Sequence, residues 1–314
     1  MPRARRADLL PQAKNMPSKV YLDYTQAELD AAYDQRVYAP NREEIVAWYA
    51  AESARVRARH AHRRSVPYGT GDDETLDLFP AKMVSESNFA APIHVHVHGG
   101  RWTLFTKDEE SFIAPMFVNA GATCIVIDFS NIPKVRIPEM VAQVKRAIAW
   151  IYRNAASFGG DPERIHLSAH SSGSHLAGVA LLTDWEHEFG VPQDVVKSAL
   201  LISGMYDLRP VMLSARSSYV KLSDEEVRAL SAILQPELLR TPLTMVYGSK
   251  ETPEFKRQPK AFLAALEVVG RTARLIEIPG ANHFEVLQQL GDGRSRVGRL
   301  ALGHIFPETE NKLP

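Results

Sequence analysis

The chain has 314 residues, 45% of them hydrophobic, which is enough for one large domain with a well-buried core. Its 37 basic and 37 acidic side chains balance each other. A net charge of zero argues against a general attraction to nucleic acid or to an anionic membrane surface, so we expect neither as a partner. The sequence does not decide between a monomer and a homo-oligomer.

Cysteine usage and the first residues bear on the location of the protein. Cys124 is the single cysteine, so no intrachain disulfide can form, as is typical of a reducing compartment. Residues 1–16 carry arginines but no apolar run long enough for a signal peptide, and no stretch approaches the length of a membrane span. We therefore expect a cytoplasmic protein.

Helical patterns come first along the chain, from about residue 26 to residue 61, and predict an N-terminal helical extension over about residues 1–65. Strand and helix patterns then alternate. The expected strands are 74–79, 93–98, 122–128, 164–168, 198–203, 243–247 and 273–278. The expected helices are 109–119, 138–156, 172–183, 254–269 and 283–291.

This alternation predicts a single α/β domain over residues 1–314, in which a mostly parallel central sheet is flanked by helices on both faces. A helical stretch at about 209–241 separates two of the expected strands. We expect this stretch to form a lid-like insertion. The chemically suggestive residues fall at carboxyl ends of strands, where ligands bind in such sheets.

Two glycines follow one expected strand, in the sequence His98-Gly99-Gly100-Arg101-Trp102. Glycines just past a strand let backbone N–H groups approach a ligand closely, and two or three such amides aimed at one point form an oxyanion hole. We expect these amides to come from the run Gly99-Gly100-Arg101. A plain turn between strand and loop is the alternative interpretation.

Ser171 lies where an expected strand breaks sharply into an expected helix. Ala169 lies two residues before it and Gly173 two residues after it, and small residues at these offsets allow the strained turn of a nucleophile elbow. Ser168 lacks such neighbours, and so does Ser172. In hydrolases with an elbow serine the next residue, here Ser172, supplies a further oxyanion amide.

An acid and a histidine should follow the serine in that order. Glu251 comes just past one expected strand, and His283 follows the next. His283 would take the proton of Ser171 and return it to the leaving group, while Glu251 would orient the imidazole and stabilise its charged form. Glu254 and Asp207 are competing acids, but Glu251 lies closest to the end of its strand.

Five segments carry a family resemblance: 98–102, 169–176, 203–210, 251–255 and 282–284. In this order they resemble the motifs of the kynurenine formamidase (arylformamidase) family and its esterase relatives in the α/β-hydrolase superfamily. The resemblance implies an α/β-hydrolase fold and a serine hydrolase that needs no metal or other cofactor. It implies a small-molecule acyl substrate, an aryl formamide such as N-formylkynurenine or a small carboxylic ester, with another ester or amide as the alternative.

The chain departs from the family pattern at three positions. Ala169 replaces the elbow glycine, Glu251 replaces the usual aspartate, and Arg101 stands where an aromatic or small residue is more usual. Arg101 could bind a carboxylate of the substrate or point outward to an acidic neighbour. The expected substrate-binding residues are Arg101, Trp102, Tyr206 and Phe284, with Phe105 as a further aromatic candidate.

Two hypotheses from other classes remain. His94, His96 and His98 alternate along one strand and so share a face, a pattern that can ligate zinc in a metal-dependent hydrolase. No matching ligand cluster follows downstream in the sequence. A non-catalytic ligand-binding protein with a hydrolase fold would be expected to lack a member of the triad, and all three positions are filled here.

Overall fold

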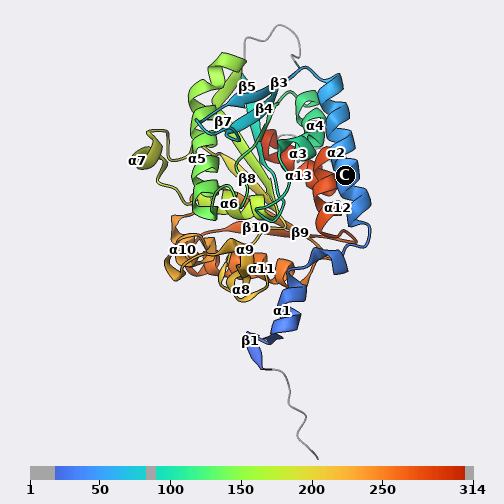
Figure 1. Ribbon diagram of the computed structural model, residues 1–314. Helices are drawn as coiled ribbons and strands as arrows, with labels where there is room; N and C mark the ends of the chain where they lie inside the picture. The colour runs from blue at the N-terminus through green and yellow to red at the C-terminus, as the bar shows by residue number, and fades with distance from the viewer. Residues whose placement is uncertain (1–17, 83–89, 308–314) are drawn as a thin grey trace, which may run out of the picture.

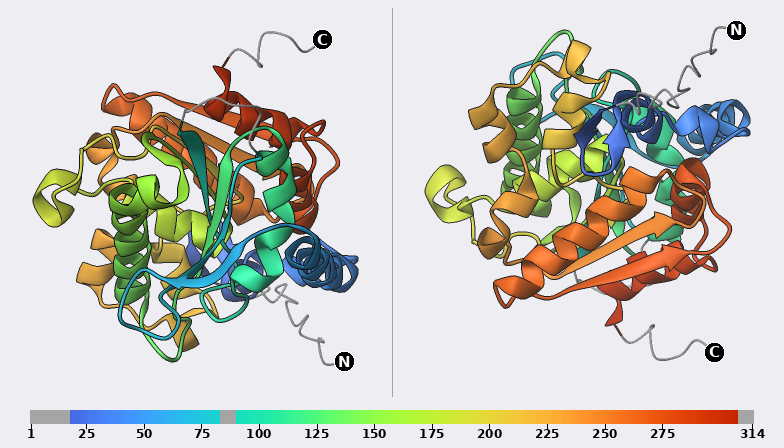
Figure 2. Two further views of the ribbon diagram at one scale, coloured as in Figure 1. Left: turned by 90° about the horizontal axis from the view of Figure 1, so that it is seen from above. Right: turned by 90° about the horizontal axis from the view of Figure 1, so that it is seen from below.

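The computed structural model describes residues 18–82 and 90–307, and its centre is an eight-stranded sheet with helices on both faces (Figure 1, Figure 2). The strands are β3 (Arg63–Pro67), β4 (Thr75–Phe79), β5 (Ala91–Val97), β6 (Thr123–Ile127), β7 (Gly160–His170), β8 (Ser198–Ile202), β9 (Leu243–Gly248) and β10 (Ala273–Ile278). They lie in the order β10-β9-β8-β7-β5-β6-β4-β3. β4 is antiparallel to both β3 and β6, and the other neighbours are parallel. The predicted mostly parallel, helix-flanked sheet is confirmed.

Alternation along the strands divides the side chains between two hydrophobic cores, one on each face of the sheet. Along β6, Ile125 and Ile127 belong to one core, whereas Cys124 and Val126 belong to the other. The first core receives side chains from α5 (Ile137–Asn154), α6 (Ser172–Ala180) and α11 (Pro253–Val268). The second receives them from α2 (Arg42–Arg59), α4 (Ala114–Asn119), α12 (His283–Gln288) and α13 (Arg296–Ile305).

Helix α5 shows why these segments are helical. Its apolar residues recur every three or four positions, and Met140, Val144, Ile148 and Ile151 are all fully buried on one side. Pro138 lies in the first turn, where a missing N–H costs no hydrogen bond. Burial of each large apolar side chain contributes roughly 1.5–3 kcal/mol, so the buried face of the helix fixes it on the sheet.

The N-terminal part of the chain folds back onto α11. It contains β1 (Lys19–Tyr21), β2 (Tyr24–Thr25), α1 (Gln26–Ala32) and the 3-10 turn η1 (Gln35–Val37), followed by α2. Thr252 Oγ1 donates to the Ala32 carbonyl at 2.6 Å, and the Tyr33 hydroxyl donates to Glu254 Oε2 at 3.2 Å. The pattern missed strand β3 because most of its residues are polar and exposed, so it lacks the alternation of a half-buried strand.

The predicted insertion between β8 and β9 consists of short helices. They are α8 (Arg209–Leu213), α9 (Ser217–Val220), α10 (Asp224–Ala229), η4 (Ala232–Leu234) and η5 (Pro236–Leu238). The Ala215 amide donates to Asp30 Oδ1 at 2.6 Å, and Gln26 Nε2 donates to the Leu213 carbonyl at 2.9 Å. These bonds join the insertion to α1, although the two segments are far apart in sequence.

The remaining elements are short. They are α3 (Lys107–Glu110), η2 (Ser111–Ile113), η3 (Ala155–Phe158), α7 (Trp185–Phe189) and η6 (Gln289–Gly291).

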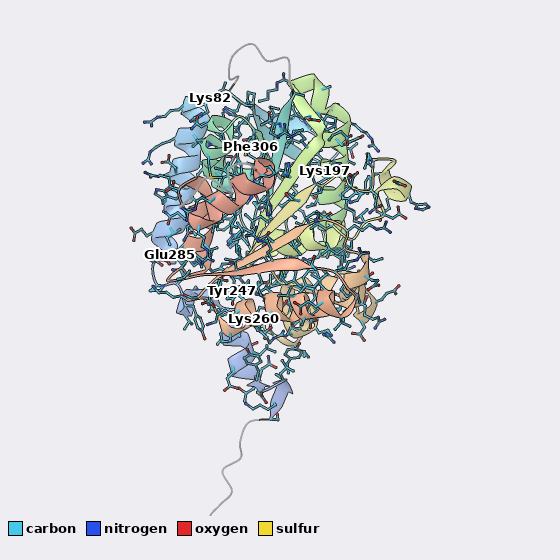
Figure 3. The ribbon with its side chains drawn as sticks, turned by 180° about the vertical axis from the view of Figure 1, so that it is seen from behind. Lys82, Lys197, Tyr247, Lys260, Glu285 and Phe306 are labelled. Atoms are coloured by element: carbon cyan, nitrogen blue, oxygen red, sulfur yellow. The ribbon has the colours of Figure 1, made fainter. Side chains whose placement is uncertain are left out.

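Figure 3 shows the opposite side of the molecule, where Lys260 of α11 lies 5.6 Å from the ring centroid of Tyr247 on β9. No helix in the described ranges is both long and apolar enough to cross a membrane.

Four of the buried histidines in or beside the sheet have a lowered pKa: His94, His166, His170 and His175. His94 and His166 face each other across β5 and β7, and burial lowers the pKa of both, that of His166 to about 4. Burial likewise lowers the pKa of His170 to about 3 and that of His175 to about 4. These four imidazoles are therefore neutral in the folded protein at neutral pH.

We predict that the free energy of unfolding decreases as the pH falls below about 6.5, because the unfolded chain then binds protons that these histidines exclude when folded. Each contributes about 1.4 kcal/mol per pH unit between about pH 6.5 and its folded pKa. The pKa of His98 is raised in the folded protein. The contribution of His98 to the free energy of unfolding is therefore lost as the pH rises above this window. Urea unfolding at about pH 7.5 and about pH 5 measures the difference, and a constant or rising stability on acidification would contradict the prediction.

Candidate active site

Ser171 lies on a sharp turn between β7 and α6, with φ 54° and ψ −119°. Its amide donates to the Ile202 carbonyl at 2.8 Å, which ties the turn to the neighbouring strand. Gly173 then passes so close to β5 that a Cβ atom there would lie 2.2 Å from the His98 carbonyl oxygen and 2.4 Å from that of Val97. Only glycine fits at this crossing, as the elbow interpretation requires.

Ser171, His283 and Glu251 form a continuous hydrogen-bonded chain. The Ser171 Oγ and His283 Nε2 are 2.9 Å apart, and His283 Nδ1 lies 2.8 Å from Glu251 Oε2. The other carboxylate oxygen accepts from the Ser203 hydroxyl at 2.6 Å and the Gly248 amide at 2.7 Å, so this fully buried acid is well satisfied. The carboxylate places the proton on Nδ1, and the lone pair of Nε2 then faces the serine.

The two competing acids have other partners. Glu254 binds Arg257 at 2.6 Å. Asp207 accepts from the Arg209 amide at 3.0 Å and from its guanidinium, which is a local turn contact. The structure therefore brings Glu251, rather than either alternative, to the histidine.

The glycine loop after β5 differs in one detail from the expectation. The Gly99 amide donates to Glu110 Oε1 at 3.1 Å, so it is not free to bind an oxyanion, and this corrects its expected role. Gly100 has φ 110°, and a Cβ atom there would lie 1.8 Å from the Leu104 carbonyl oxygen. In the described part of the chain no acceptor is found for the Gly100 and Arg101 amides. The Ser172 amide lies in the first turn of α6, where N–H groups have no partner within the helix.

Buried charges hold Gly99 from both sides. Glu110 is fully buried and lies 2.7 Å from His96 Nε2. Burial raises the pKa of Glu110, but the hydrogen bond and charge of His96 outweigh it and leave that pKa below its ordinary value. On the other side, His98 Nδ1 lies 2.8 Å from the Gly99 carbonyl oxygen and donates to it.

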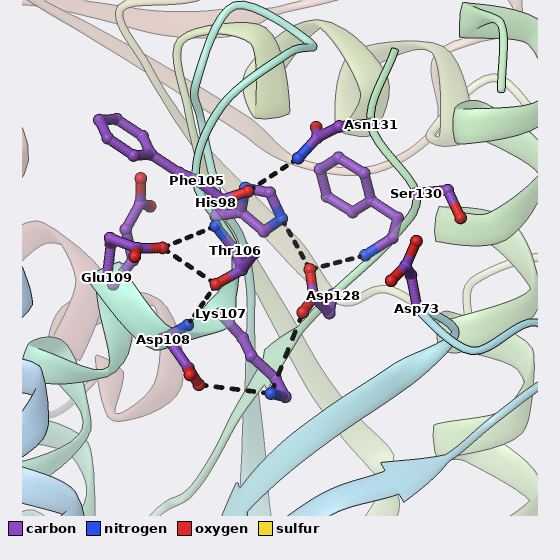
Figure 4. A network of polar contacts seen from close by, with 12 residues as sticks. Asp73, His98, Phe105, Thr106, Lys107, Asp108, Glu109, Asp128, Ser130 and Asn131 are labelled. Carbon is purple, nitrogen blue, oxygen red and sulfur yellow. Dashed lines mark hydrogen bonds and ion pairs between the residues drawn. The ribbon is translucent and has the colours of Figure 1, made fainter. Parts of the chain in front are cut away.

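Asp128, Lys107 and Asp108 form a second polar network on the Nε2 side of His98 (Figure 4). His98 Nε2 lies 3.3 Å from Asp128 Oδ1, and Lys107 Nζ lies 3.9 Å from the other oxygen of that carboxylate. Burial alone would lower the pKa of His98, but the hydrogen bond and charge of Asp128 raise it. Lys107 also lies 3.3 Å from Asp108, which links the network to α3.

A pocket opens over Ser171 and His283. Of the residues expected to bind substrate, Arg101 and Phe284 line it. The structure does not place the other two there. Their side chains are only 1% exposed: Trp102 donates from Nε1 to His175 at 3.3 Å, and Tyr206 stacks on Phe262.

Several lining residues were not predicted from sequence. The N-terminal segment contributes Tyr33, Asp34, Gln35, Arg36 and Arg42, the insertion contributes Arg216, and His170 and Leu104 adjoin the motifs. No local sequence pattern predicts that the N-terminal residues or Arg216 line the pocket, because only the folding of distant segments brings them there. His170, next to the nucleophile in sequence, could have been found from its position.

The alternating histidines His94, His96 and His98 all have polar partners within the protein. His94 Nε2 and His96 Nδ1 lie 2.8 and 2.7 Å from the same Ser168 hydroxyl, while His96 Nε2 binds Glu110. His98 binds the Gly99 carbonyl and Asp128. In the ranges that the structure describes, no group of three or more His, Cys, Asp or Glu side chains converges as a metal site would require.

Comparisons with known proteins show the family of the chain. A family model described as BD-FAE matches residues 76–208. Kynurenine formamidase of Salmo salar is 30% identical over 244 residues, which cover 76% of this chain and 80% of that protein. Esterase LipQ of Mycobacterium tuberculosis is 31% identical over 248 residues, covering 71% of this chain and 57% of that protein.

A solved structure from Silicibacter sp. TM1040, provisionally described as a thioesterase, is 26% identical and superimposes with a TM-score of 0.75. The match covers 88% of this chain and 99% of that one. The strand order of the sheet, the sharp turn at Ser171 and the similarity to these relatives together define the chain as an α/β-hydrolase, and so as an enzyme. Within that class it belongs to the kynurenine formamidase family, together with its HGG-motif esterase relatives.

We predict that Gly173→Ala lowers both stability and activity, because the added Cβ meets two backbone carbonyls that cannot move aside. Overpacking of this kind costs roughly 1–3 kcal/mol. Gly178→Ala in the same helix is the matched control, since its Cβ would meet nothing closer than 3.7 Å. Urea midpoints and ester hydrolysis rates of both variants test this, and equal behaviour of the two would contradict it.

Proposed function

We propose that the chain is a serine hydrolase that cleaves an aryl formamide, of the N-formylkynurenine type, through an acyl-enzyme on Ser171. The observation that carries the proposal is the hydrogen-bonded order of Ser171, His283 and Glu251 at the floor of a pocket. A nucleophile, a base and an acid in this geometry suit acyl transfer whatever the fold.

In the proposed first step His283 Nε2 takes the proton of Ser171 as Oγ attacks the carbonyl carbon. The carbonyl π electrons move to its oxygen, and the amides of Gly100, Arg101 and Ser172 stabilise that charge. The intermediate collapses as His283 gives the proton to the departing amine or alcohol. Water, activated by the same imidazole, then hydrolyses the acyl-enzyme and releases the acid.

Glu251 has an electrostatic role in this scheme. Its carboxylate holds the Nδ1 proton of His283 and stabilises the imidazolium that forms in both steps. Ser203 and Gly248 bind the second oxygen of that carboxylate, which restricts its orientation. Glutamate can therefore serve where the family usually has aspartate.

The substrate class rests on the relatives and on the pocket lining. One relative is a kynurenine formamidase, and Tyr33, Phe105 and Phe284 offer aromatic surface to an aryl leaving group. A small carboxylic ester is the second candidate, because another relative is an esterase and the same machinery cleaves both bonds. The buried single Cys124 suits a reducing compartment, and we place the reaction in the cytoplasm, without a cofactor.

We predict that Ser171→Ala lowers kcat/KM for N-formylkynurenine by about a thousandfold or more, since only binding and the oxyanion amides remain. A fluorophosphonate probe should label Ser171 in the unaltered protein, as mass spectrometry of its peptides would show. Ser157 is exposed and does not line the pocket, so Ser157→Ala should keep full activity and labelling.

The same assay, run with N-formylkynurenine and with a short-chain nitrophenyl ester, ranks the two substrate classes. Addition of EDTA should leave both rates unchanged. Full activity of Ser171→Ala would overturn the serine mechanism, and activity lost only on chelation would replace it with metal chemistry at the histidines.

A further inference from the structure

Trp102 does not line the pocket, but its side chain makes a specific contact behind the glycine loop. The residue is only 1% exposed. Its indole Nε1 donates to Nδ1 of His175 in α6 at 3.3 Å, and the two rings meet edge to face with their centroids 5.5 Å apart. On the far side of the same imidazole, Nε2 lies 2.9 Å from the carbonyl oxygen of Leu230, where α10 ends. One histidine thus joins the glycine loop to the insertion.

The partners of His175 leave its imidazole only one arrangement of protons. A carbonyl oxygen can only accept, so Nε2 carries the proton, and an indole N–H can only donate, so Nδ1 carries the lone pair. Burial lowers the pKa of His175 to about 4. The ring therefore stays neutral at neutral pH, and both bonds persist.

The backbone at this end of the glycine loop needs support. Arg101 has φ 59° and Trp102 has φ 63°, so two successive residues with large side chains adopt the left-handed conformation. Such backbone is unfavourable for residues other than glycine and persists only where surrounding contacts fix it. The Ile132 amide, which donates to the Trp102 carbonyl at 2.8 Å, supplies one such contact. The indole bond to His175 supplies another, and it is one that a change of side chain can remove.

Trp102 also lies between two of the proposed oxyanion donors. Its amide donates to Ser172 Oγ at 3.3 Å, and the Ser172 amide is one of those donors. The amide of the preceding residue, Arg101, is another. A rotation of the backbone between Arg101 and Trp102 would therefore change the direction of the Arg101 N–H relative to that of Ser172.

We propose that Trp102 and His175 are positioning residues for the reaction. Their hydrogen bond fixes the left-handed end of the glycine loop, and so keeps the amides of Arg101 and Ser172 directed at the same oxygen of the tetrahedral intermediate. The inference rests on the proposed function, since it requires such an intermediate on the elbow serine. Gly173 fixes where this loop starts, against the end of β5, and Trp102 fixes where it ends.

A purely structural bond would behave differently. If it served only to stabilise the core, its loss would lower the free energy of unfolding, and the folded protein would react at the usual rate. A bond that positions the amides matters only when the oxyanion forms, so its loss lowers kcat and leaves KM unchanged.

Two ketones of similar shape separate these roles. The carbonyl carbon of trifluoroacetophenone bonds to Ser171 Oγ as the serine proton passes to His283, and the carbonyl π electrons become the oxyanion of a hemiketal. Acetophenone, whose carbonyl is less electrophilic, binds only as the free ketone. The ratio of their inhibition constants therefore measures the stabilisation of the oxyanion.

Trp102→Phe removes the indole donor. His175→Gln removes its acceptor, because the glutamine amide takes about the place of Nε2 and keeps only the bond to Leu230. Each variant should lower kcat for a short-chain nitrophenyl ester about 10- to 100-fold and weaken inhibition by trifluoroacetophenone by a similar factor. KM and inhibition by acetophenone should not change. His175→Asn, whose side-chain oxygen takes about the place of Nδ1, should restore part of both losses.

The double variant Trp102→Phe/His175→Gln should be no slower than the slower single variant, since both changes break the same bond. His166→Gln is the matched control. His166 is likewise a buried, neutral imidazole, bonded to the Ser198 hydroxyl at 2.8 Å, but its partner is the first residue of β8, at the opposite strand ends from the glycine loop. This variant should keep kcat and both inhibition constants, even if its urea midpoint falls.

Unchanged kcat and unchanged inhibition by trifluoroacetophenone in Trp102→Phe and His175→Gln would overturn the inference and leave the serine mechanism intact. Losses that multiply in the double variant, or an equal loss in His166→Gln, would overturn it too. If Trp102→Phe does not fold, the pair His175→Gln and His175→Asn carries the same test. Equal inhibition of Ser171→Ala and the unaltered protein by trifluoroacetophenone would instead show that no hemiketal forms, and the proposed function would fail together with the inference.

Discussion

The close contact between Gly173 and the end of β5 is the constraint on which the site depends. Because a Cβ atom at this position would meet the carbonyls of Val97 and His98, the start of α6 can lie directly against the strand that leads into the glycine loop. Ser171 and the loop amides thus come from two backbone segments that touch. The geometry of Ser171 relative to Gly100 is consequently set by main-chain packing, which is far stiffer than any arrangement of side chains.

The loop itself is positioned by buried charge. Glu110 accepts from the amide of Gly99 and His98 donates to its carbonyl, so both peptide units that flank Gly99 are restrained. A buried polar contact such as that of Glu110 with His96 contributes little net stability, because desolvation offsets the attraction. Their contribution here is orientation: Gly99 is held in place, and among the described residues the amides of Gly100 and Arg101 have no acceptor. This explains why an apparently expensive network of histidines and acids lies under a short glycine loop.

The sequence predicts those parts of the site that depend on local signals. Ser171 follows from the small residues at fixed offsets, and Glu251 and His283 follow from their positions just past strands. Trp102 and Tyr206 were misplaced because adjacency to a motif says nothing about the direction of a side chain, and both turn into the core. The Gly99 amide was misassigned because its acceptor, Glu110, reaches it from a separate helix. Tyr33 and Arg216 were missed for the same reason on a larger scale, since only the folded chain brings their segments over the pocket.

The electrostatics of the pocket connect these observations. In the proposed acyl transfer His283 would become an imidazolium, and Glu251 would supply one compensating charge from the buried side. The arginines on the open side favour the negative oxyanion but oppose the positive imidazole, because both lie in the same poorly screened space. The neutral state of His170, whose pKa is lowered by burial and by the charge of His283, shows how strongly this region already disfavours another cation.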